Sequence, residues 1–430
     1  MAKRQSSTLK EECSANKKLK ICSEESEKSV ESPKPAEESS NYRSLLDLSD
    51  DILLIILSKL HPIDIEALSK TSSRLNVVCR DRTLWTDVDL RPYPLVASAL
   101  EKFTEFFLPV TKSIACRGPA EHVLPEADHP LPDPPPAAPL VYSMTRELME
   151  AIGLQACHLS KLILENQCIN TSELLLEYFP NTLEHLELKD SILENMPSQQ
   201  SYFYNVKTNL PYLKVLDLTG SKWFMPHSLI ALSKSASLKE LILAKCMNLY
   251  DCVPYASLAS CYGFRSLEVL DLRGTQVEDS DVTCFNRVST LSKLYLEAPA
   301  AVMEGRRLIT DLCVTSFGGV RAHHNHPHRH FPPGGEPLNH MELHRIGVLL
   351  LEAYPWRVQK PSQLTCLVVR NYSAITDISL KHASTCLPNL TWLDVRGTSC
   401  TELGVRLFCQ QRPDVTLISD HSSPLPISNR

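Results

Sequence analysis

A leucine phrase that recurs along the chain decides the fold: TLEHLEL (182–188), YLKVLDL (212–218), SLKELIL (237–243), SLEVLDL (266–272), LTCLVVR (364–370) and LTWLDVR (390–396). Eight copies follow the pattern L-x-x-L-x-L, and their first leucines are Leu159, Leu183, Leu213, Leu238, Leu267, Leu291, Leu364 and Leu390. Successive copies begin 24, 30, 25, 29, 24, 73 and 26 residues apart. Units of roughly 20–29 residues built this way contain one strand and one helix or loose turn, and they bury their leucines by stacking. The sequence therefore predicts an α/β fold, a curved leucine-rich-repeat solenoid.

The interval of 73 residues between Leu291 and Leu364 is close to three periods, which leaves room for degenerate units. Ile309, Leu312 and Val314 form one weak copy of the phrase. Much of the remainder is an inserted loop that holds seven of the fifteen histidines. We therefore expect residues 298–363 to form an irregular repeat with a histidine-rich loop, between regular repeats at 141–297 and 364–418.

A helical module at residues 43–90 precedes the repeats. Ser49 stands where an N-cap is expected, and Asp50 and Asp51 lie at the positive end of the helix that follows. Pro62 ends this run, and Asp64 can cap a second helix. A third helix is indicated by apolar residues at helical spacing: Leu75, Val78 and Cys79. Three short helices make a small core, so we expect part of their apolar surface to meet a partner.

The remaining segments differ in composition. Residues 91–117 predict a helix at 96–107, a short strand near Ile114 and a first irregular repeat. Residues 118–140 form a proline-rich insertion, and residues 419–430 a tail. The leader at 1–42 is rich in Lys, Glu and Ser and is predicted to be disordered. Two basic clusters in it, at 3–4 and 17–20, have the spacing of a two-part nuclear import signal, so we expect a protein of cytoplasm and nucleus.

Composition excludes several classes of protein. The net charge of −6 does not indicate the basic surface that is typical of nucleic-acid-binding proteins. Fifteen cysteines without a C-x-x-C pair fit reduced thiols in an intracellular protein better than a disulfide framework. No apolar run is long enough to span a membrane. The histidine-rich loop is the one metal candidate, but its irregular spacing does not match a fixed set of four ligands.

The repeat pattern also predicts a binding surface. The residue between the last two leucines and the residue after them point to the concave face, where carboxylates and arginines alternate on the late repeats. We predict a mixed-charge surface that recognises an acidic group on a protein: Asp271, Arg273, Tyr295, Arg370, Trp392, Asp394 and Arg396. Arg and Trp are common interface anchors. The alternative is that these charges only neutralise one another along the sheet.

The helical module resembles the F-box, and with the repeats the chain resembles the F-box/leucine-rich-repeat family. The matching residues are Leu48, Ile52, Ile56, Leu57, Leu60, Asp64, Leu68, Arg74, Leu84 and Trp85. The chain departs from the pattern at Ser49, Thr71 and Leu75, where the family usually has proline, valine and tryptophan. Residues 375–397 resemble the cysteine-containing repeats of the same family.

The resemblance implies a substrate receptor of a Skp-cullin-F-box ubiquitin ligase. The F-box would bind a Skp-family adaptor, and through it a cullin and a RING protein, while the repeats hold a protein substrate for ubiquitination and proteasomal degradation. The residues expected to face the adaptor are Leu48, Ile52, Ile56, Leu57, Leu60, Pro62, Asp64 and Leu68, although half of them could instead pack the module's core. No catalytic motif, cofactor or metal site is predicted. A ligase-independent binding scaffold is the alternative, and an enzyme is a more distant one.

Overall fold

The computed structural model describes residues 44–119, 142–197, 200–306, 308–318 and 362–421. The chain divides into two units, Met1–Asp47 and Leu48–Arg430. The described part of the first contains the 3-10 turn η1 (Leu45–Asp47). The predicted leader lies outside the described residues, as do nearly all of the proline-rich insertion, the histidine-rich loop and most of the tail.

Three short helices open the second unit: α1 (Asp50–Leu57), α2 (Pro62–Ser69) and α3 (Ser73–Cys79), followed by the 3-10 turn η2 (Arg82–Leu84). Ser49 is the N-cap of α1, as expected. The prediction that Asp64 caps α2 is wrong. His61 is the N-cap residue, its Nδ1 accepts a hydrogen bond from the Ile63 amide at 3.3 Å, and Asp64 lies within the first turn.

The predicted third helix is confirmed, and its apolar residues form the core of the module with Leu53, Leu57 and Trp85. The Trp85 indole N–H donates to the Cys79 carbonyl at 2.7 Å, so the buried ring leaves no polar atom unpaired. Trp85 also stacks on Phe106 of the first repeat, with ring centroids 4.6 Å apart. The module and the first repeat therefore share one hydrophobic core.

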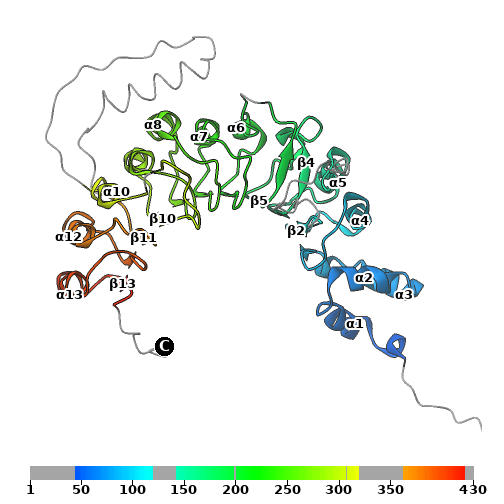
Figure 1. Cartoon of the computed structure of the whole chain (residues 1–430). Coiled ribbons are helices and arrows are strands. Elements are labelled where there is room, and N and C mark those ends of the chain that lie inside the picture. Colours follow the sequence, from blue (N-terminus) through cyan, green and yellow to red (C-terminus); the bar gives the residue numbers. More distant parts are fainter. Residues whose placement is uncertain (1–43, 120–141, 198–199, 307, 319–361, 422–430) are drawn as a thin grey trace, which may run out of the picture. The chain divides into compact units, whose positions relative to one another are not determined.

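The repeats form an eleven-stranded, all-parallel sheet in the described residues, in sequence order (Figure 1). Its strands are β1 (Asp87–Asp89), β2 (Ser113–Arg117), β3 (Lys161–Glu165), β5 (His185–Lys189), β7 (Val215–Asp217), β8 (Glu240–Ile242), β9 (Val269–Asp271), β10 (Lys293–Glu297), β11 (Cys366–Arg370), β12 (Trp392–Asp394) and β13 (Thr416–Ile418). Two further strands, β4 (Cys168–Asn170) and β6 (Ile192–Glu194), pair separately. All eight leucine phrases lie on strands of the large sheet, which confirms the solenoid.

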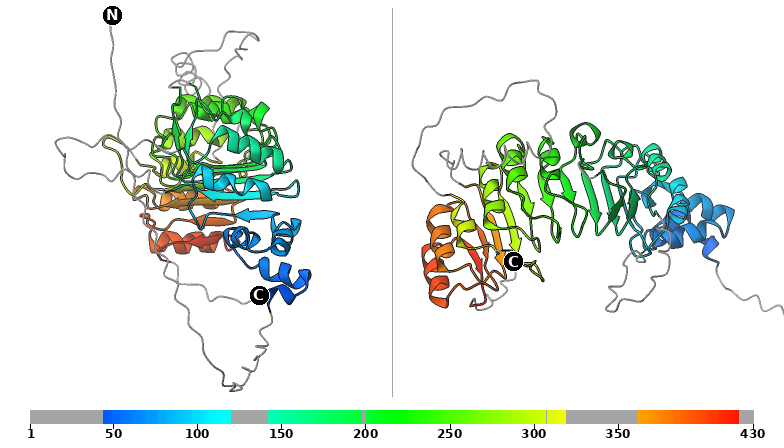
Figure 2. Two further views of the ribbon diagram at one scale, coloured as in Figure 1. Left: turned by 90° about the vertical axis from the view of Figure 1, so that its right-hand side faces the viewer. Right: turned by 45° about the horizontal axis from the view of Figure 1, so that its top comes forward.

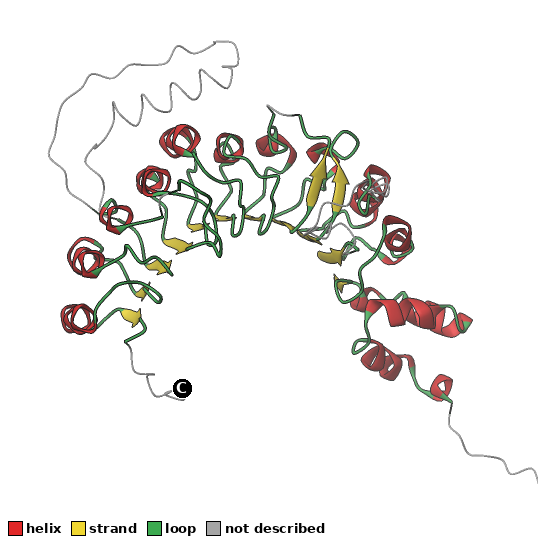
Figure 3. Cartoon of the chain, viewed as in Figure 1, coloured by secondary structure: helices red, strands yellow, loops and turns green. Residues whose placement is uncertain are grey.

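Helices cover one face of the sheet and leave the other open (Figures 2 and 3). They are α4 (Ala97–Glu101), η3 (Thr104–Phe106), α5 (Arg146–Gln155), η5 (Leu176–Tyr178), α6 (Val206–Asn209), α7 (Ser228–Ser233), α8 (Val253–Tyr262), α9 (Asp279–Thr283), η6 (Cys284–Arg287), α10 (Asp311–Thr315), α12 (Asp377–Cys386) and α13 (Glu402–Gln411). The single helix expected at 96–107 is two shorter pieces, α4 and η3. In Figure 3 the strands line the concave side of the curve and the helices lie outside it. No helix in the described ranges is long and apolar enough to cross a membrane.

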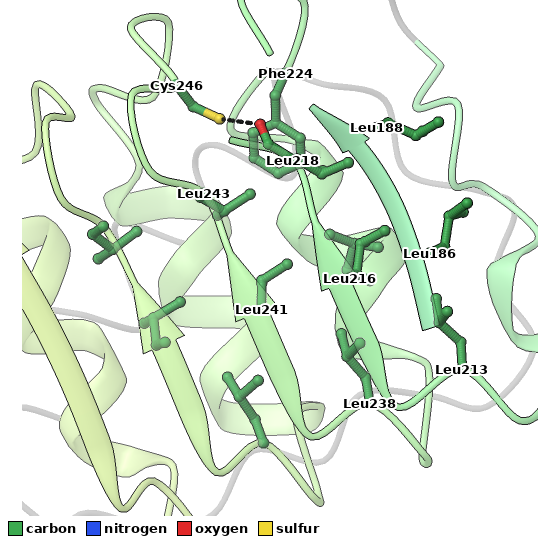
Figure 4. Packing of buried hydrophobic residues seen from close by; sticks show 14 of the residues in the cluster. Leu186, Leu188, Leu213, Leu216, Leu218, Phe224, Leu238, Leu241, Leu243 and Cys246 are labelled. Carbon is green, nitrogen blue, oxygen red and sulfur yellow. Dashed lines mark hydrogen bonds between the residues drawn. The ribbon is translucent and has the colours of Figure 1, made fainter. Parts of the chain in front are cut away.

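The core is a stack of the phrase leucines. Leu186, Leu216 and Leu241 lie side by side on neighbouring strands and are fully buried (Figure 4). The Cys246 thiol donates to the Leu218 carbonyl at 3.2 Å. Each unit thus supplies one layer, and a layer is buried only when a neighbour stacks on it.

The described residues between Leu291 and Leu364 add no further strand between β10 and β11. β10 pairs directly with β11, in register from Lys293 opposite Cys366 to Glu297 opposite Arg370. Leu312 and Val314 lie in helix α10, not on a strand, and α10 packs beside α9 and α12. The interval therefore holds one repeat, with the undescribed segment 319–361 inserted between its helix and the next strand.

Candidate functional site

Strand register arranges the concave face into columns. Side chains at alternate positions of a strand share a face, and parallel strands in register bring equivalent positions together. Asp271, Tyr295, Val368 and Asp394 are paired in turn across β9, β10, β11 and β12. Lys293, Cys366 and Trp392 form a second column, two residues nearer the start of the phrase. These columns follow the alternation predicted from the leucine phrase.

Two buried carboxylates lie beneath the arginines of this surface. Asp271 is 4% exposed and Asp394 is fully buried. Asp271 accepts hydrogen bonds from Nε and Nη2 of Arg273 at 2.5–3.0 Å. Burial raises the pKa of Asp394, but hydrogen bonds from Arg396 and Arg370 outweigh it and hold that pKa below its usual range. Both acids are therefore structural counter-ions that fix the arginines in place.

An open pocket of about 410 Å³ lies over β9–β12. Its lining combines cationic, aromatic and apolar side chains: Arg273, Lys293, Tyr295, Cys366, Val368, Arg370 and Trp392. The Arg273 guanidinium lies 5.6 Å from the centre of the Tyr295 ring. Burial, and then the neighbouring Cys366, raises the pKa of Tyr295 to about 12, so this phenol is neutral at physiological pH.

The structure brings together part of the surface predicted from sequence. Arg273, Tyr295, Arg370 and Trp392 line the pocket, whereas Asp271 and Asp394 lie beneath it and Arg396 pairs with Asp394 beside it. The alternative prediction, in which the charges neutralise one another along the sheet, describes Asp271 and Asp394. Lys293 and Cys366 were missed. The sequence signal for the additional column is the residue just before the second leucine of each phrase: Lys293, Cys366 and Trp392.

A second charged cluster, on β5 and β7, has its cation bound by two carboxylates. Glu187 is hydrogen-bonded to His185 at 2.7 Å, and Lys189 forms ion pairs with Glu187 at 2.5 Å and with Asp217 at 3.1 Å. Burial raises the pKa of Glu187, but these two partners outweigh it and lower the pKa to about 2. This cluster is held together by its own side chains.

The helical module has an exposed apolar face on α1. Leu53 and Leu57, one helical turn apart, point into the core and are 1% and 2% exposed. On the opposite side Ile52, Ile55 and Ile56 are 46%, 64% and 38% exposed. Three exposed isoleucines on one short helix form an apolar patch of the kind that marks an interaction surface.

The residues predicted to face the adaptor divide into three groups by their exposure. Ile52, Ile56 and Asp64 are exposed, and Leu48, Leu60, Pro62 and Leu68 are half-buried. Leu57 is a core residue and is not available at the surface. Ile55 was missed, although its spacing of three from Ile52 places it on the same face. Leu75, one of the departures from the F-box pattern, fills the core at 5% exposed.

Among the described residues no group of three or more His, Cys, Asp and Glu side chains is placed to hold a metal ion. The histidine-rich loop lies outside those residues. All thirteen cysteines that the structure describes are free thiols.

Residues 45–87 match the family model of the F-box domain. That match spans η1, the three helices and Trp85. No curated protein matches the chain. Among solved structures, the yeast Rad7 and Elc1 complex is similar at 13% identity and a TM-score of 0.42, covering 86% of this chain and 87% of that chain. A leucine-rich-repeat (LRR) protein of Leptospira interrogans is similar at 12% identity and a TM-score of 0.33, covering 77% and 69%. The repeat fold therefore rests on the strands and helices described above, and the F-box assignment on the family match.

Proposed function

We propose that this chain is the substrate-recognition subunit of a Skp-cullin-F-box ubiquitin ligase. Its F-box would dock on a Skp-family adaptor, which joins a cullin and a RING protein, and its leucine-rich repeats would hold the protein substrate. Within the F-box/LRR family, we propose that its layout resembles F-box/LRR-repeat protein twelve: an early F-box, a helix directly after it and irregular repeats. The leader's basic clusters support activity in both nucleus and cytoplasm.

The observation that carries the proposal is the isoleucine face of α1 in a segment that matches the F-box. Leu53 and Leu57 fill the core without help from Ile52, Ile55 or Ile56. Exposing these isoleucines costs hydrophobic free energy that a partner recovers by covering them, roughly 25 cal/mol for each Å² of apolar surface. Docking of a protein on this face would cover all three side chains.

A receptor of this kind needs no reacting side chain. It raises the effective concentration of a substrate lysine near a thioester held elsewhere in the assembly. The shared core of the module and the first repeat supports this role. Trp85 stacks on Phe106, and the backbone carbonyl of Trp85 accepts a hydrogen bond from the Thr111 hydroxyl at 2.7 Å. A stiff connection keeps the substrate surface at a defined position relative to the adaptor.

Co-purification of a Skp-family adaptor with the full chain tests the proposal. We expect capture by the parent chain and loss, by at least about tenfold, in the double variant Ile52→Glu and Ile56→Glu, because a buried unpaired carboxylate is costly. Both positions are exposed, so the variant should keep its fold. Leu154→Glu is the matched control, since Leu154 on α5 is 78% exposed and lies outside the F-box.

If a folded parent chain captures no adaptor, the ligase proposal is wrong and the chain is a ligase-independent binding scaffold. Equal capture by the parent and the double variant would mean that the α1 face is not the docking surface.

A further inference from the structure

An apolar row lies on the helix-covered side of the late repeats, away from the concave face. Its members are Leu312 on α10, Ile378 on α12, and Leu403 and Leu407 on α13. Their exposed fractions are 68%, 61%, 66% and 48%. We propose that this convex row is a docking surface for a basic amphipathic helix of a partner protein. It lies outside the F-box match and outside the pocket over β9–β12, so it is separate from both surfaces described above.

Hydrogen bonds between helix N-termini hold the row in register. The first-turn aspartates of α10 and α12 each accept from the amide and the hydroxyl of the threonine that caps the next helix, at 2.6–2.8 Å. Leu312, Ile378 and Leu403 are each the second residue of their helix, and α12 packs between α10 and α13. Figure 1 shows these three helices in succession along the outer side of the curve. The three side chains therefore occupy equivalent positions on neighbouring helices.

The row does not contribute to the core beneath it. Other residues of the same helices fill that core and are buried: Cys313, Val314, Leu380, Ala383, Val405 and Phe408. Single exposed apolar side chains are ordinary on a protein surface, whereas a contiguous exposed patch marks an interaction site. The equivalent residue on α9 is the exposed, polar Ser280, so the row begins at α10.

The length of the row fits one helix. Packed helices lie about 8–10 Å apart, so Leu312, Ile378 and Leu403 span about 16–20 Å. A helix rises about 1.5 Å per residue, so residues seven apart recur about every 10.5 Å on one face. A partner helix laid across α10, α12 and α13, with apolar residues at i, i+7 and i+14, therefore meets the three side chains in turn. Apolar anchors at helical spacing are typical of amphipathic helices that bind another protein.

The helices that carry and flank the row are negatively charged. The carboxylates on α9, α10, α12 and α13 all lie in the first turn of their helix: Asp279, Asp281, Asp311, Asp377 and Glu402. The cations on these four helices are Lys381 and Arg406, and Arg406 pairs with Glu402. Carboxylates thus outnumber cations beside the apolar side chains.

The loops next to the row do not reverse this charge. Glu304 is exposed in the loop before α10, where Arg306 is bound by Asp251 at 2.7 Å. Before α13, Arg396 is bound by Asp394. A negative rim attracts Lys and Arg side chains that flank the apolar face of a partner helix, and it repels the phosphates of nucleic acids and anionic lipids. The partner that fits is therefore a basic protein segment.

The test uses the full chain and three fluorescent synthetic peptides of about 18 residues, the length of helix that spans the row. The first has Leu at i, i+3, i+7, i+11 and i+14, with Lys and Arg on its other face. The second has Glu in place of Lys and Arg, and the third has the residues of the first in scrambled order. We expect anisotropy to show binding of the first peptide, and binding of the other two at least about tenfold weaker. Added salt should weaken the binding, because part of the attraction is between exposed charges.

The double variant Ile378→Gln with Leu403→Gln assigns the binding to the row. It removes apolar contact on two helices without changing the charge, and Gln is a good helix former, so the chain should keep its fold. We expect the affinity for the first peptide to fall by at least about tenfold. Leu154→Gln is the matched control, since Leu154 on α5 is 78% exposed and lies outside the row. Circular dichroism checks that both variants are folded.

Each other outcome overturns the proposal. Equal binding of the basic and the Glu-containing peptides would remove the role of charge, and equal binding by the parent and the double variant would place the peptide elsewhere. Binding that appears only after deletion of residues 319–361 would make that segment of the chain the occupant. A parent chain that sediments as a dimer and binds no peptide, with a monomeric double variant, would make the row a contact between two copies.

Discussion

Glu187 is a buried carboxylate whose charge contributes to stability. Its pKa of about 2 in the folded chain lies below the usual 4.5, because the hydrogen bonds from His185 and Lys189 outweigh burial. The folded state thus favours the ionised form. The stabilisation is complete above about pH 4.5 and is lost as the pH falls from about 4.5 towards about 2.

We therefore predict that Glu187→Gln lowers the urea midpoint at pH 7, and that the difference from the parent chain shrinks as the pH falls through that window. The exposed Glu184→Gln, on the same strand layer, should change the free energy of unfolding by less than about 0.5 kcal/mol. A difference for Glu187→Gln that stays constant from pH 7 to 3 would contradict the assignment.

The residues of the concave face were predictable wherever the alternation of side chains along a strand alone decides which face a side chain lies on. The positions of Asp271, Arg273 and Asp394 followed from the leucine phrase. The burial of Asp271 and Asp394 could not be predicted in this way, because it depends on which longer side chains cover them. Leu57 was misplaced for a related reason: spacing identifies the two sides of α1, but packing against α3 decides which side is inside.

At the scale of elements, an aspartate ladder joins successive repeats. Asp279, Asp311 and Asp377, each in the first turn of a helix, accept from both the amide and the hydroxyl of the threonine that caps the next helix, at 2.6–2.8 Å. Asp311 also accepts from Ser379 at 2.5 Å. These contacts satisfy helix-end groups that would otherwise lack partners.

Asp311→Ala should therefore destabilise the chain by about 2–3 kcal/mol, because it leaves the Thr376 amide and hydroxyl and the Ser379 hydroxyl without their acceptor. Chemical denaturation measures this change. Asp51→Ala is the matched control, since Asp51 lies in the first turn of α1 and is exposed. Equal effects of the two substitutions would show that the ladder adds nothing beyond a helix-dipole contribution.

The insertion at 319–361 interrupts a repeat that is complete without it. Five residues, 288–292, join η6 to β10, and five, 387–391, join α12 to β12. If Gly318 were linked directly to Ser362, residues 316–318 and 362–365 would leave seven between α10 and β11. The spacing of 73 residues leaves both an added repeat and an inserted segment open, because length alone does not distinguish them.

Deletion of residues 319–361 should consequently leave the solenoid folded, with a single cooperative unfolding transition and a midpoint close to that of the full chain. Circular dichroism during thermal unfolding measures both. Loss of cooperativity, or a chain that no longer folds, would show that the segment supports the sheet.

At the scale of the whole molecule, one chain carries two separate surfaces: the isoleucine face of the F-box and the cationic pocket on the late repeats. Substitutions that share no contacts act independently. We therefore predict that Lys293→Glu, in the pocket on the late repeats, leaves adaptor capture unchanged. Co-purification of the adaptor with this variant checks the prediction. Loss of adaptor capture in a folded Lys293→Glu variant would indicate that the two surfaces are coupled.

The most direct test of the account is assembly of the ligase from purified parts. The full chain is immobilised and incubated with a cullin–RING complex, with and without a Skp-family adaptor. We predict that the cullin is retained only when the adaptor is present, and that Ile52→Glu with Ile56→Glu abolishes its retention while Leu154→Glu does not. A folded chain that retains no cullin in the presence of adaptor would contradict the account.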